Sequence, residues 1–253
     1  MNITKQLSRS LMALLLFSAC KTTQIKTENN TFVKKELTLE NMGVAGNTTL
    51  NLISRLEKEV LREKPDLVIL MVGTNDMLNS KKFVSYETYR SNLDQIVKRI
   101  KENKAQILLM SPPTVDSIYL YMRHDKALFK DTPNVKLQKA GQIVEQVAQD
   151  NQVLFVDINA AFKANNLPAH NQDDYIRNEK NSNVKDGVHL KPLGYKFIAD
   201  NVFNYLKDNG LLNTYKRIIC FGDSLTKGSG ASGAGTISGE NYPSFLYTML
   251  TSN

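Results

Sequence analysis

Near its C-terminus the chain reads Lys216-Arg217-Ile218-Ile219-Cys220-Phe221-Gly222-Asp223-Ser224-Leu225-Thr226, and this segment is the clearest sign of the fold class. The apolar run 218–221 is typical of a parallel strand covered on both faces. Gly222 ends the run, and a polar, glycine-rich segment follows. Ser224 therefore comes just past the carboxyl end of a strand, at the edge where ligands bind in open α/β sheets. A serine there can act as a nucleophile, although Asp223 and Ser224 could also simply form a turn.

Apolar runs and helical patterns alternate along the rest of the chain. The expected strands are 36–40, 67–72, 106–110, 153–157 and 217–221. The expected helices are 50–63, 85–102, 132–150, one from 192 to just before Gly210, and one that begins near 242. Strands that alternate with helices imply a parallel sheet with helices on both faces. The sequence therefore predicts an α/β fold whose five strands all end at one edge.

The first twenty residues have a different character. Lys5 and Arg9 precede the apolar run 11–17, and Ser18-Ala19-Cys20 follows it. A basic segment, a short apolar segment and small residues describe an export signal, and the apolar run is too short to span a bilayer. Because Cys20 directly follows two small residues, the segment resembles a bacterial lipoprotein signal, in which that cysteine is lipidated. The alternative is a plain secretory signal that contains a cysteine.

This pattern predicts three parts: a signal peptide with a lipidation site at Cys20 over 1–20, a tether over 21–35, and one domain over 36–253. We therefore expect an exported lipoprotein of the cell envelope, periplasmic or on the outer surface. A lipid anchor would be its contact with the membrane. If Cys20 carries lipid, the second cysteine, Cys220, cannot form an intramolecular disulfide with it, and we expect a buried thiol.

Composition and charge describe an ordinary globular protein. The chain is 42% hydrophobic and 23% charged, which is enough for one sizeable core. Its net charge is +7, and about +5 once Lys5 and Arg9 are removed with residues 1–19. The basic residues form no dense block with interleaved aromatic residues, so we expect no nucleic-acid partner.

The predicted edge of the sheet carries the groups that ester hydrolysis needs. The hydroxyl of Ser224 needs a base, and His189 is suited to that role because its ordinary pKa is near neutrality. Asp186 comes three residues earlier and can hold the other ring nitrogen. The backbone N–H groups of Ser224 and Gly46, with the side-chain amide of Asn75, can stabilise an oxyanion.

Four short blocks around these residues resemble those of the SGNH (GDSL-type) hydrolases. They are Gly222-Asp223-Ser224-Leu225, Gly43-Val44-Ala45-Gly46-Asn47-Thr48-Thr49, Gly73-Thr74-Asn75-Asp76 and Asp186-Gly187-Val188-His189-Leu190. The resemblance implies a flavodoxin-like α/β/α sandwich with a five-stranded parallel sheet. It also implies hydrolysis of esters, often acetyl groups on carbohydrates, without a cofactor. The implied catalytic residues are Ser224, His189 and Asp186, and the implied oxyanion hole is Ser224, Gly46 and Asn75.

The order of the blocks departs from the family, in which the serine block comes first. Here the order is glycine, asparagine, aspartate–histidine and then serine. This order implies a circular permutation, which is tolerated where chain termini lie close together on the surface. By resemblance, strand 217–221 should lie between strands 36–40 and 67–72. We expect a monomer, with a swapped dimer completed by residues 213–253 as the alternative.

Other motifs in the sequence have simpler explanations. Residues 228–233 match G-x-G-x-x-G, but a dinucleotide site needs a helix there and a second strand with an acid, and the chain leaves room only for a helix. His124 and His170 show no metal-ligand spacing, so we expect surface histidines and no metal site. Tyr119, Tyr121 and Tyr175 can stack on a sugar or pack in the core or a lid.

The function that these observations favour is a serine esterase acting on short-chain, chiefly acetyl, esters of a small molecule or glycan. One alternative is a lipase-like or thioesterase activity, which a long apolar channel would distinguish. The other is a non-catalytic, lipid-tethered glycan-binding protein that kept the fold.

Overall fold

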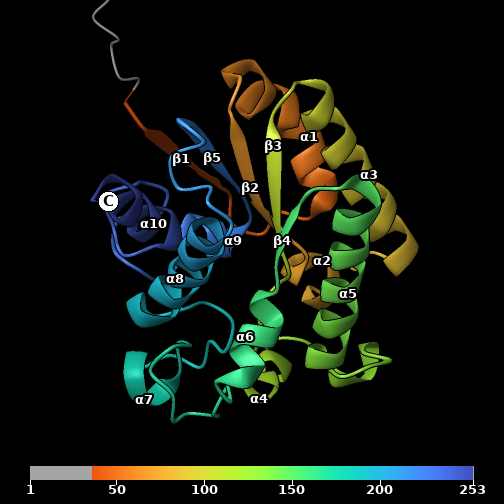
Figure 1. Cartoon of the computed structure of the whole chain (residues 1–253). Coiled ribbons are helices and arrows are strands. Elements are labelled where there is room, and N and C mark those ends of the chain that lie inside the picture. Colours follow the sequence, from red (N-terminus) through yellow and green to blue (C-terminus); the bar gives the residue numbers. More distant parts are fainter. Residues whose placement is uncertain (1–35, 253) are drawn as a thin grey trace, which may run out of the picture. The chain divides into compact units, whose positions relative to one another are not determined.

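Five parallel strands form one sheet in the order β1-β5-β2-β3-β4 (Figure 1). The strands are β1 (Thr38–Gly43), β2 (Leu67–Met71), β3 (Gln106–Met110), β4 (Leu154–Val156) and β5 (Arg217–Gly222). The last strand in the sequence thus lies between the first two, as the family resemblance implied. The computed structural model describes residues 36–252. The predicted signal peptide with Cys20 and the tether lie outside the described residues.

Helices cover both faces of the sheet (Figure 1). On one face lie α1 (Thr49–Glu59), α3 (Tyr86–Glu102) and α5 (Pro133–Asn151), and on the other lie α6 (Ile158–Ala164), α8 (Pro192–Asp208) and α10 (Tyr242–Thr251). Shorter elements connect them: η1 (Leu61–Glu63), α2 (Thr74–Leu78), α4 (Ser117–Tyr121), η2 (Lys126–Leu128), α7 (Glu179–Ser182) and α9 (Ser224–Lys227). Residues 36–252 form one compact unit.

Side-chain alternation along the central strands builds two apolar layers. In β5, Ile219 and Phe221 join the layer under α1, α3 and α5, while Ile218 and Cys220 join the layer under α8 and α10. All of β2 is buried. Runs of this kind carry no polar alternation because both faces are covered. Complete burial also raises the pKa of the Cys220 thiol to about 12, so this cysteine is an inert core residue, as expected.

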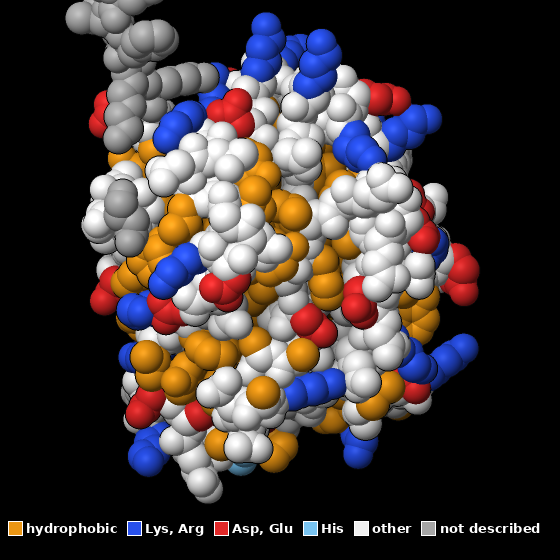
Figure 2. Space-filling view, viewed as in Figure 1, with side chains coloured by type: hydrophobic (Ala, Val, Ile, Leu, Met, Phe, Trp, Pro, Cys, Tyr) orange, Lys and Arg blue, Asp and Glu red, His pale blue; other side chains and the backbone are white. Residues whose placement is uncertain are grey.

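The edge strands β1 and β4 are less completely covered. Leu154 and Phe155 of β4 are half-buried. In the view of Figure 2, apolar side chains gather in the middle of the face, in front of the β4 edge. Among the described residues, no helix combines the length and apolar character needed to cross a membrane.

The first strand lies further along the chain than predicted. It covers Thr38–Gly43 instead of 36–40, because Asn41 and Gly43 pair in register with Cys220 and Gly222 of β5. These residues have low strand propensity, and pairing with a central strand overrides it. Gly43 is required by close packing, since a Cβ there would lie 2.0 Å from the backbone nitrogen of Lys227 in α9.

The five predicted helices are present, but the first of them is shorter than predicted. The helix predicted over 50–63 ends at Glu59 and continues as η1. The sequence did not predict the short helices α2, α6, α7 and α9. Helix α6 follows β4 directly, because the carboxylate of Asp157 accepts a 2.9 Å hydrogen bond from the N–H of Ala160 and caps it.

Candidate active site

Ser224 lies where β5 passes into α9. It is the first residue of α9, and it is 6% exposed. Asp223 caps this helix by accepting a 2.9 Å hydrogen bond from the N–H of Leu225. The first N–H groups of a helix have no intrahelical acceptor. Among the described residues, the N–H of Ser224 donates to no other group, so it remains a free donor beside the hydroxyl.

Ser224 lines a cavity of about 280 Å³ at the carboxyl edge of the sheet. The lining residues are Thr74, Asn75, Leu78, Asn79, Leu120, Arg123, His124, Val188, His189 and Ser224. Three residues from distant blocks of the sequence, Asn75, His189 and Ser224, therefore meet at one site.

His189 is held by Asp186 through its ring and its backbone. Ring Nδ1 lies 2.9 Å from Oδ2 of Asp186, and the backbone N–H donates to Oδ1 at 3.0 Å. Burial by itself would raise the pKa of Asp186, but the hydrogen bond and charge of His189, with the N–H groups of His189 and Val188, outweigh burial and hold that pKa well below its usual range. An ionised Asp186 fixes the proton on Nδ1 and leaves Nε2 as the basic nitrogen.

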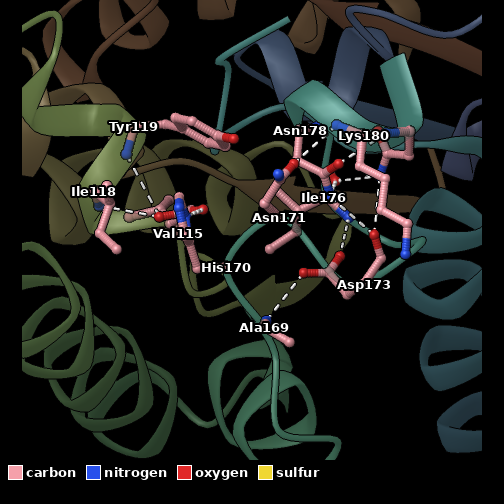
Figure 3. A network of polar contacts seen from close by, with 12 residues as sticks. Val115, Ile118, Tyr119, Ala169, His170, Asn171, Asp173, Ile176, Asn178 and Lys180 are labelled. Atoms are coloured by element: carbon pink, nitrogen blue, oxygen red, sulfur yellow. Dashed lines mark hydrogen bonds and ion pairs between the residues drawn. The ribbon is translucent and has the colours of Figure 1, made fainter. Parts of the chain in front are cut away.

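A polar segment from 165 to 185 supports the His189 block. The sequence predicts an irregular polar segment over 163–185, whereas the structure gives this region a short helix, α7, and hydrogen bonds around Asp173. The carboxylate of Asp173 accepts from the N–H groups of Ala169 and Ile176, at 3.0 and 2.7 Å (Figure 3). Arg177 then joins the segment to the block, because its N–H donates to the carbonyl oxygen of His189 at 2.9 Å. This hydrogen-bonded segment therefore supports the block that carries His189 and Asp186.

The predicted oxyanion donors are only partly placed at the cavity. Gly46 has a left-handed φ of 77° and does not line the cavity. Its N–H donates to no other described residue, while its carbonyl oxygen accepts from Lys82 at 2.7 Å. Asn75 lines the cavity, but its Nδ2 donates to the carbonyl oxygen of Asn47 at 3.1 Å and to Oδ2 of Asp223 at 3.2 Å. Its amide must turn from one of these acceptors to serve an oxyanion.

Buried carboxylates that the sequence did not single out lie beneath the site. Complete burial raises the pKa of Asp223 to about 7; the N–H of Leu225 opposes the rise, and the charge of Asp76 adds to it. Asp76 itself accepts from the backbone N–H and hydroxyl of Thr49, at 3.0 and 2.5 Å, and burial raises its pKa too. Asp76 therefore ties the start of α1 to the asparagine block.

Arg55 of α1 is a further residue that the sequence did not reveal. Its guanidinium donates to the carbonyl oxygens of Gly222 at 2.7 Å and Met42 at 3.0 Å, and to Oδ1 of Asn47 at 2.7 Å. It also lies 4.3 Å from the centre of the Phe221 ring. One cation thus joins the glycine loop to the serine strand. An arginine in an amphipathic helix gives no signal for such a role in the sequence.

The two remaining histidines and three tyrosines of interest lie in different surroundings. His124 is half-buried and lines the cavity, with Nδ1 2.9 Å from the hydroxyl of Ser80. His170 is largely exposed, and its Nδ1 lies 2.6 Å from the carboxylate of Asp116. Tyr119 is buried beside His170 (Figure 3), while Tyr121 and Tyr175 pack on phenylalanines, so packing accounts for all three tyrosines.

The glycine-rich segment 228–239 forms turns and bends, and no helix begins in it. It packs against Arg177 of the polar segment that supports His189, because a Cβ at Gly230 would lie 2.6 Å from the side chain of Arg177. Within residues 36–252, no group of three or more His, Cys, Asp or Glu side chains is arranged to hold a metal ion. A larger cavity, of about 460 Å³, lies around Met77, Phe83 and Lys136 and includes none of the predicted catalytic residues.

Curated relatives match part of the chain. It is 31% identical over 129 residues to an acetylxylan esterase from Geobacillus stearothermophilus, covering 48% of this chain and 54% of the relative. It is 30% identical over 94 residues to an arylesterase from Vibrio mimicus, covering 36% and 46%. It is also 28% identical over 103 residues to an uncharacterized lipoprotein from Bacillus subtilis (strain 168), covering 37% and 42%. The chain thus spans about half the length of the curated relatives it matches.

Solved structures share the fold. A lipase/acylhydrolase from Enterococcus faecalis superposes with a TM-score of 0.51 at 24% identity, covering 65% of this chain and 72% of that one. A catalytic mutant of an acetylxylan esterase from Geobacillus stearothermophilus gives 0.52 at 24% identity, covering 65% and 69%. The model of the GDSL-like Lipase/Acylhydrolase family matches residues 28–197, a segment that ends before β5. Because this match takes in more than half of the sequence, the chain belongs to the GDSL-like lipase/acylhydrolase family.

Proposed function

We propose that the chain is a serine esterase that hydrolyses short-chain esters, chiefly acetyl esters on carbohydrate. The observation that carries this proposal is the meeting of Ser224, His189 and Asn75 at one cavity, with Asp186 hydrogen-bonded behind His189. Nucleophile, base, orienting acid and amide donor are the set that acyl transfer requires.

In the proposed reaction the hydroxyl oxygen of Ser224 attacks the ester carbonyl, and Nε2 of His189 takes its proton. Asp186 keeps the proton on Nδ1 and stabilises the imidazolium that forms. The N–H groups of Ser224 and Gly46, with the amide of Asn75, receive the oxyanion. The alcohol leaves with the proton from His189. Water then attacks the acyl-serine and gives its proton to His189. The bond from the acyl carbon to the Ser224 oxygen breaks, and His189 returns the proton to that oxygen, which releases the acid and restores the hydroxyl.

The hydroxyl and the imidazole share the cavity without a hydrogen bond between them among the described contacts. Catalytic hydrogen bonds are often long in the absence of substrate and shorten when the substrate is bound. This geometry is therefore compatible with the proposed roles.

The size and lining of the cavity favour a short acyl group. Its apolar part is limited to a few side chains, among them Leu78, Leu120 and Val188, and its volume is about 280 Å³. A long acyl chain needs an extended apolar channel. The similarity to acetylxylan esterases supports the acetyl group and, by analogy, a carbohydrate.

The N-terminal cysteine and the order of the sequence blocks extend this proposal beyond the active site. We propose that Cys20 carries lipid and anchors the enzyme in the cell envelope, which the similarity to a lipoprotein supports. We also propose that the chain is a circular permutation of the family order. The position of β5 between β1 and β2, and a family match that ends before β5, both support it.

The test compares the wild type with Ser224→Ala on aryl esters of increasing acyl length and on acetylated xylan. We expect acetate release by the wild type, a steep fall in kcat/KM from acetyl to octanoyl esters, and a loss of several orders of magnitude in the variant. Higher kcat/KM for octanoate would favour the lipase-like alternative. Glycan binding without any ester cleavage would favour the non-catalytic one.

A further inference from the structure

One permanent cation, Arg123, lines the cavity that holds Ser224 and His189. Its guanidinium has two described polar contacts, to the carbonyl oxygen of Lys185 at 3.5 Å and to Oδ1 of Asp186 at 3.6 Å. Both are longer than the roughly 2.7–2.9 Å of a close charge-assisted hydrogen bond. The guanidinium therefore keeps donors that a ligand in the cavity can use.

The charge around Arg123 is not balanced by acids in the cavity. The described residues that line it include no Asp or Glu. Burial lowers the pKa of His124, and the charges of Arg123 and Lys81 lower it further, which disfavours its charged form. A cavity lined by one sign of charge attracts ligands of the other sign.

The nearest acid, Asp186, already has other partners. Besides its hydrogen bonds with His189, it lies 3.6 Å from Nη1 of Arg123 and equally 3.6 Å from Nη1 of Arg177. Arg177 does not line the cavity, and its side chain lies against Gly230. One arginine would balance the charge of Asp186, so the second, which faces the cavity, is available for another anion.

We infer that the cavity selects esters whose alcohol part carries a carboxylate, as an acidic sugar does, and that Arg123 binds that carboxylate. The inference rests on the proposed esterase function. The Arg123 side chain lines the cavity and is 39% exposed, so an anionic group of a ligand can reach it from solvent. A planar guanidinium can hold a carboxylate through two parallel hydrogen bonds.

The experiment uses a matched pair of acetates, 3-acetoxybenzoate and its neutral methyl ester, with wild type, Arg123→Gln, Arg123→Lys and Arg177→Gln. We expect the wild type to favour the anion by about tenfold in kcat/KM. Arg123→Gln should abolish the preference, and Arg123→Lys should keep part of it. Arg177→Gln should keep it in full, and both Gln variants should lower turnover of the neutral ester by similar factors, because both arginines lie equally close to Asp186.

Two measurements separate this inference from the esterase function and do not depend on a folded Gln variant. The wild-type preference should shrink as salt is raised from low ionic strength. The product 3-hydroxybenzoate should bind more tightly than its methyl ester in NMR titrations, even if no ester is cleaved. Equal rates for the two acetates, a preference that salt leaves unchanged, or a preference that Arg123→Gln retains would overturn the inference. Loss of all hydrolysis with carboxylate binding retained would instead overturn the esterase function.

Discussion

The side-chain amide of Asn75 donates a 3.2 Å hydrogen bond to the buried carboxylate of Asp223, the residue directly before Ser224. The same nitrogen donates to the carbonyl oxygen of Asn47 in the glycine block. Asn75 thus joins the asparagine block to the serine and glycine blocks. Two consequences can be measured, one for catalysis and one for stability.

Asn75→Ala should lower kcat by about 10²–10³-fold, the cost of removing one oxyanion donor. It should also lower the melting temperature, because it leaves the buried Oδ2 of Asp223 without the amide donor. Asn79→Ala is the matched control, since Asn79 lines the same cavity and has no predicted role. The test measures kcat of both variants at a temperature where both are folded. A loss of kcat no larger than that of Asn79→Ala would assign Asn75 a structural role alone.

The protonation of Asp223 should make stability fall as pH rises. Its pKa is raised to about 7 in the folded state, whereas an unfolded aspartate has a pKa of about 3.9. The folded state therefore holds the extra proton between these values, so its stability is fully present below about pH 4 and declines as pH rises to about 7. Asp223→Asn should remove this contribution. Melting curves from pH 4 to 8 would contradict the account if wild type and variant showed the same slope.

Asp186 should act in the opposite direction. Its folded pKa lies below the unfolded value, so its contribution to stability is present above about pH 4 and is lost as pH falls further. Asp186→Asn should therefore melt below the wild type at pH 7, with a smaller difference at low pH. Its kcat should fall by about 10³–10⁴-fold, because the imidazole loses the partner that fixes its tautomer. A variant with wild-type kcat would remove Asp186 from the mechanism.

The block order predicts that the chain can be rearranged. Helix α10 lies beside β1, where the chain begins its first strand (Figure 1). Moving residues 213–253 in front of Asn29, through a short flexible linker, should give a folded and active monomer, since loop-closure entropy grows only slowly with length. Size-exclusion chromatography and acetate release measure the result. An unfolded or inactive product would contradict the proposed permutation, and an active dimer would favour the swapped form.

The sequence predicted the sheet because its signals are local. The run Leu67–Val72 and the run Ile218–Phe221 are apolar throughout, and both are buried central strands. The first strand was misplaced because Asn41 and Gly43 take their conformation from pairing with β5, which no local pattern reports. Helix α2 was missed because Gly73-Thr74-Asn75-Asp76 has the composition of a turn.

The part of the site that the sequence predicted is the part that local motifs mark. Short blocks identified Ser224, His189 and Asn75, which line one cavity, and Asp186, which holds His189. Arg55 and Arg123 were missed because their roles depend on what the fold brings beside them: Gly222 lies 167 positions from Arg55, and Lys185 lies 62 positions from Arg123. The burial that raises the pKa of Asp223 is likewise a property of packing.

Covalent labelling of Ser224 tests the central claim most directly. A fluorophosphonate reacts with a serine that a neighbouring base activates, so incubation with the wild type should abolish ester hydrolysis with one label per chain. Peptide mass spectrometry should place that label on Ser224, and His189→Ala should react far more slowly. Full activity after incubation, or a stoichiometric label on another residue that accompanies inactivation, would contradict the account.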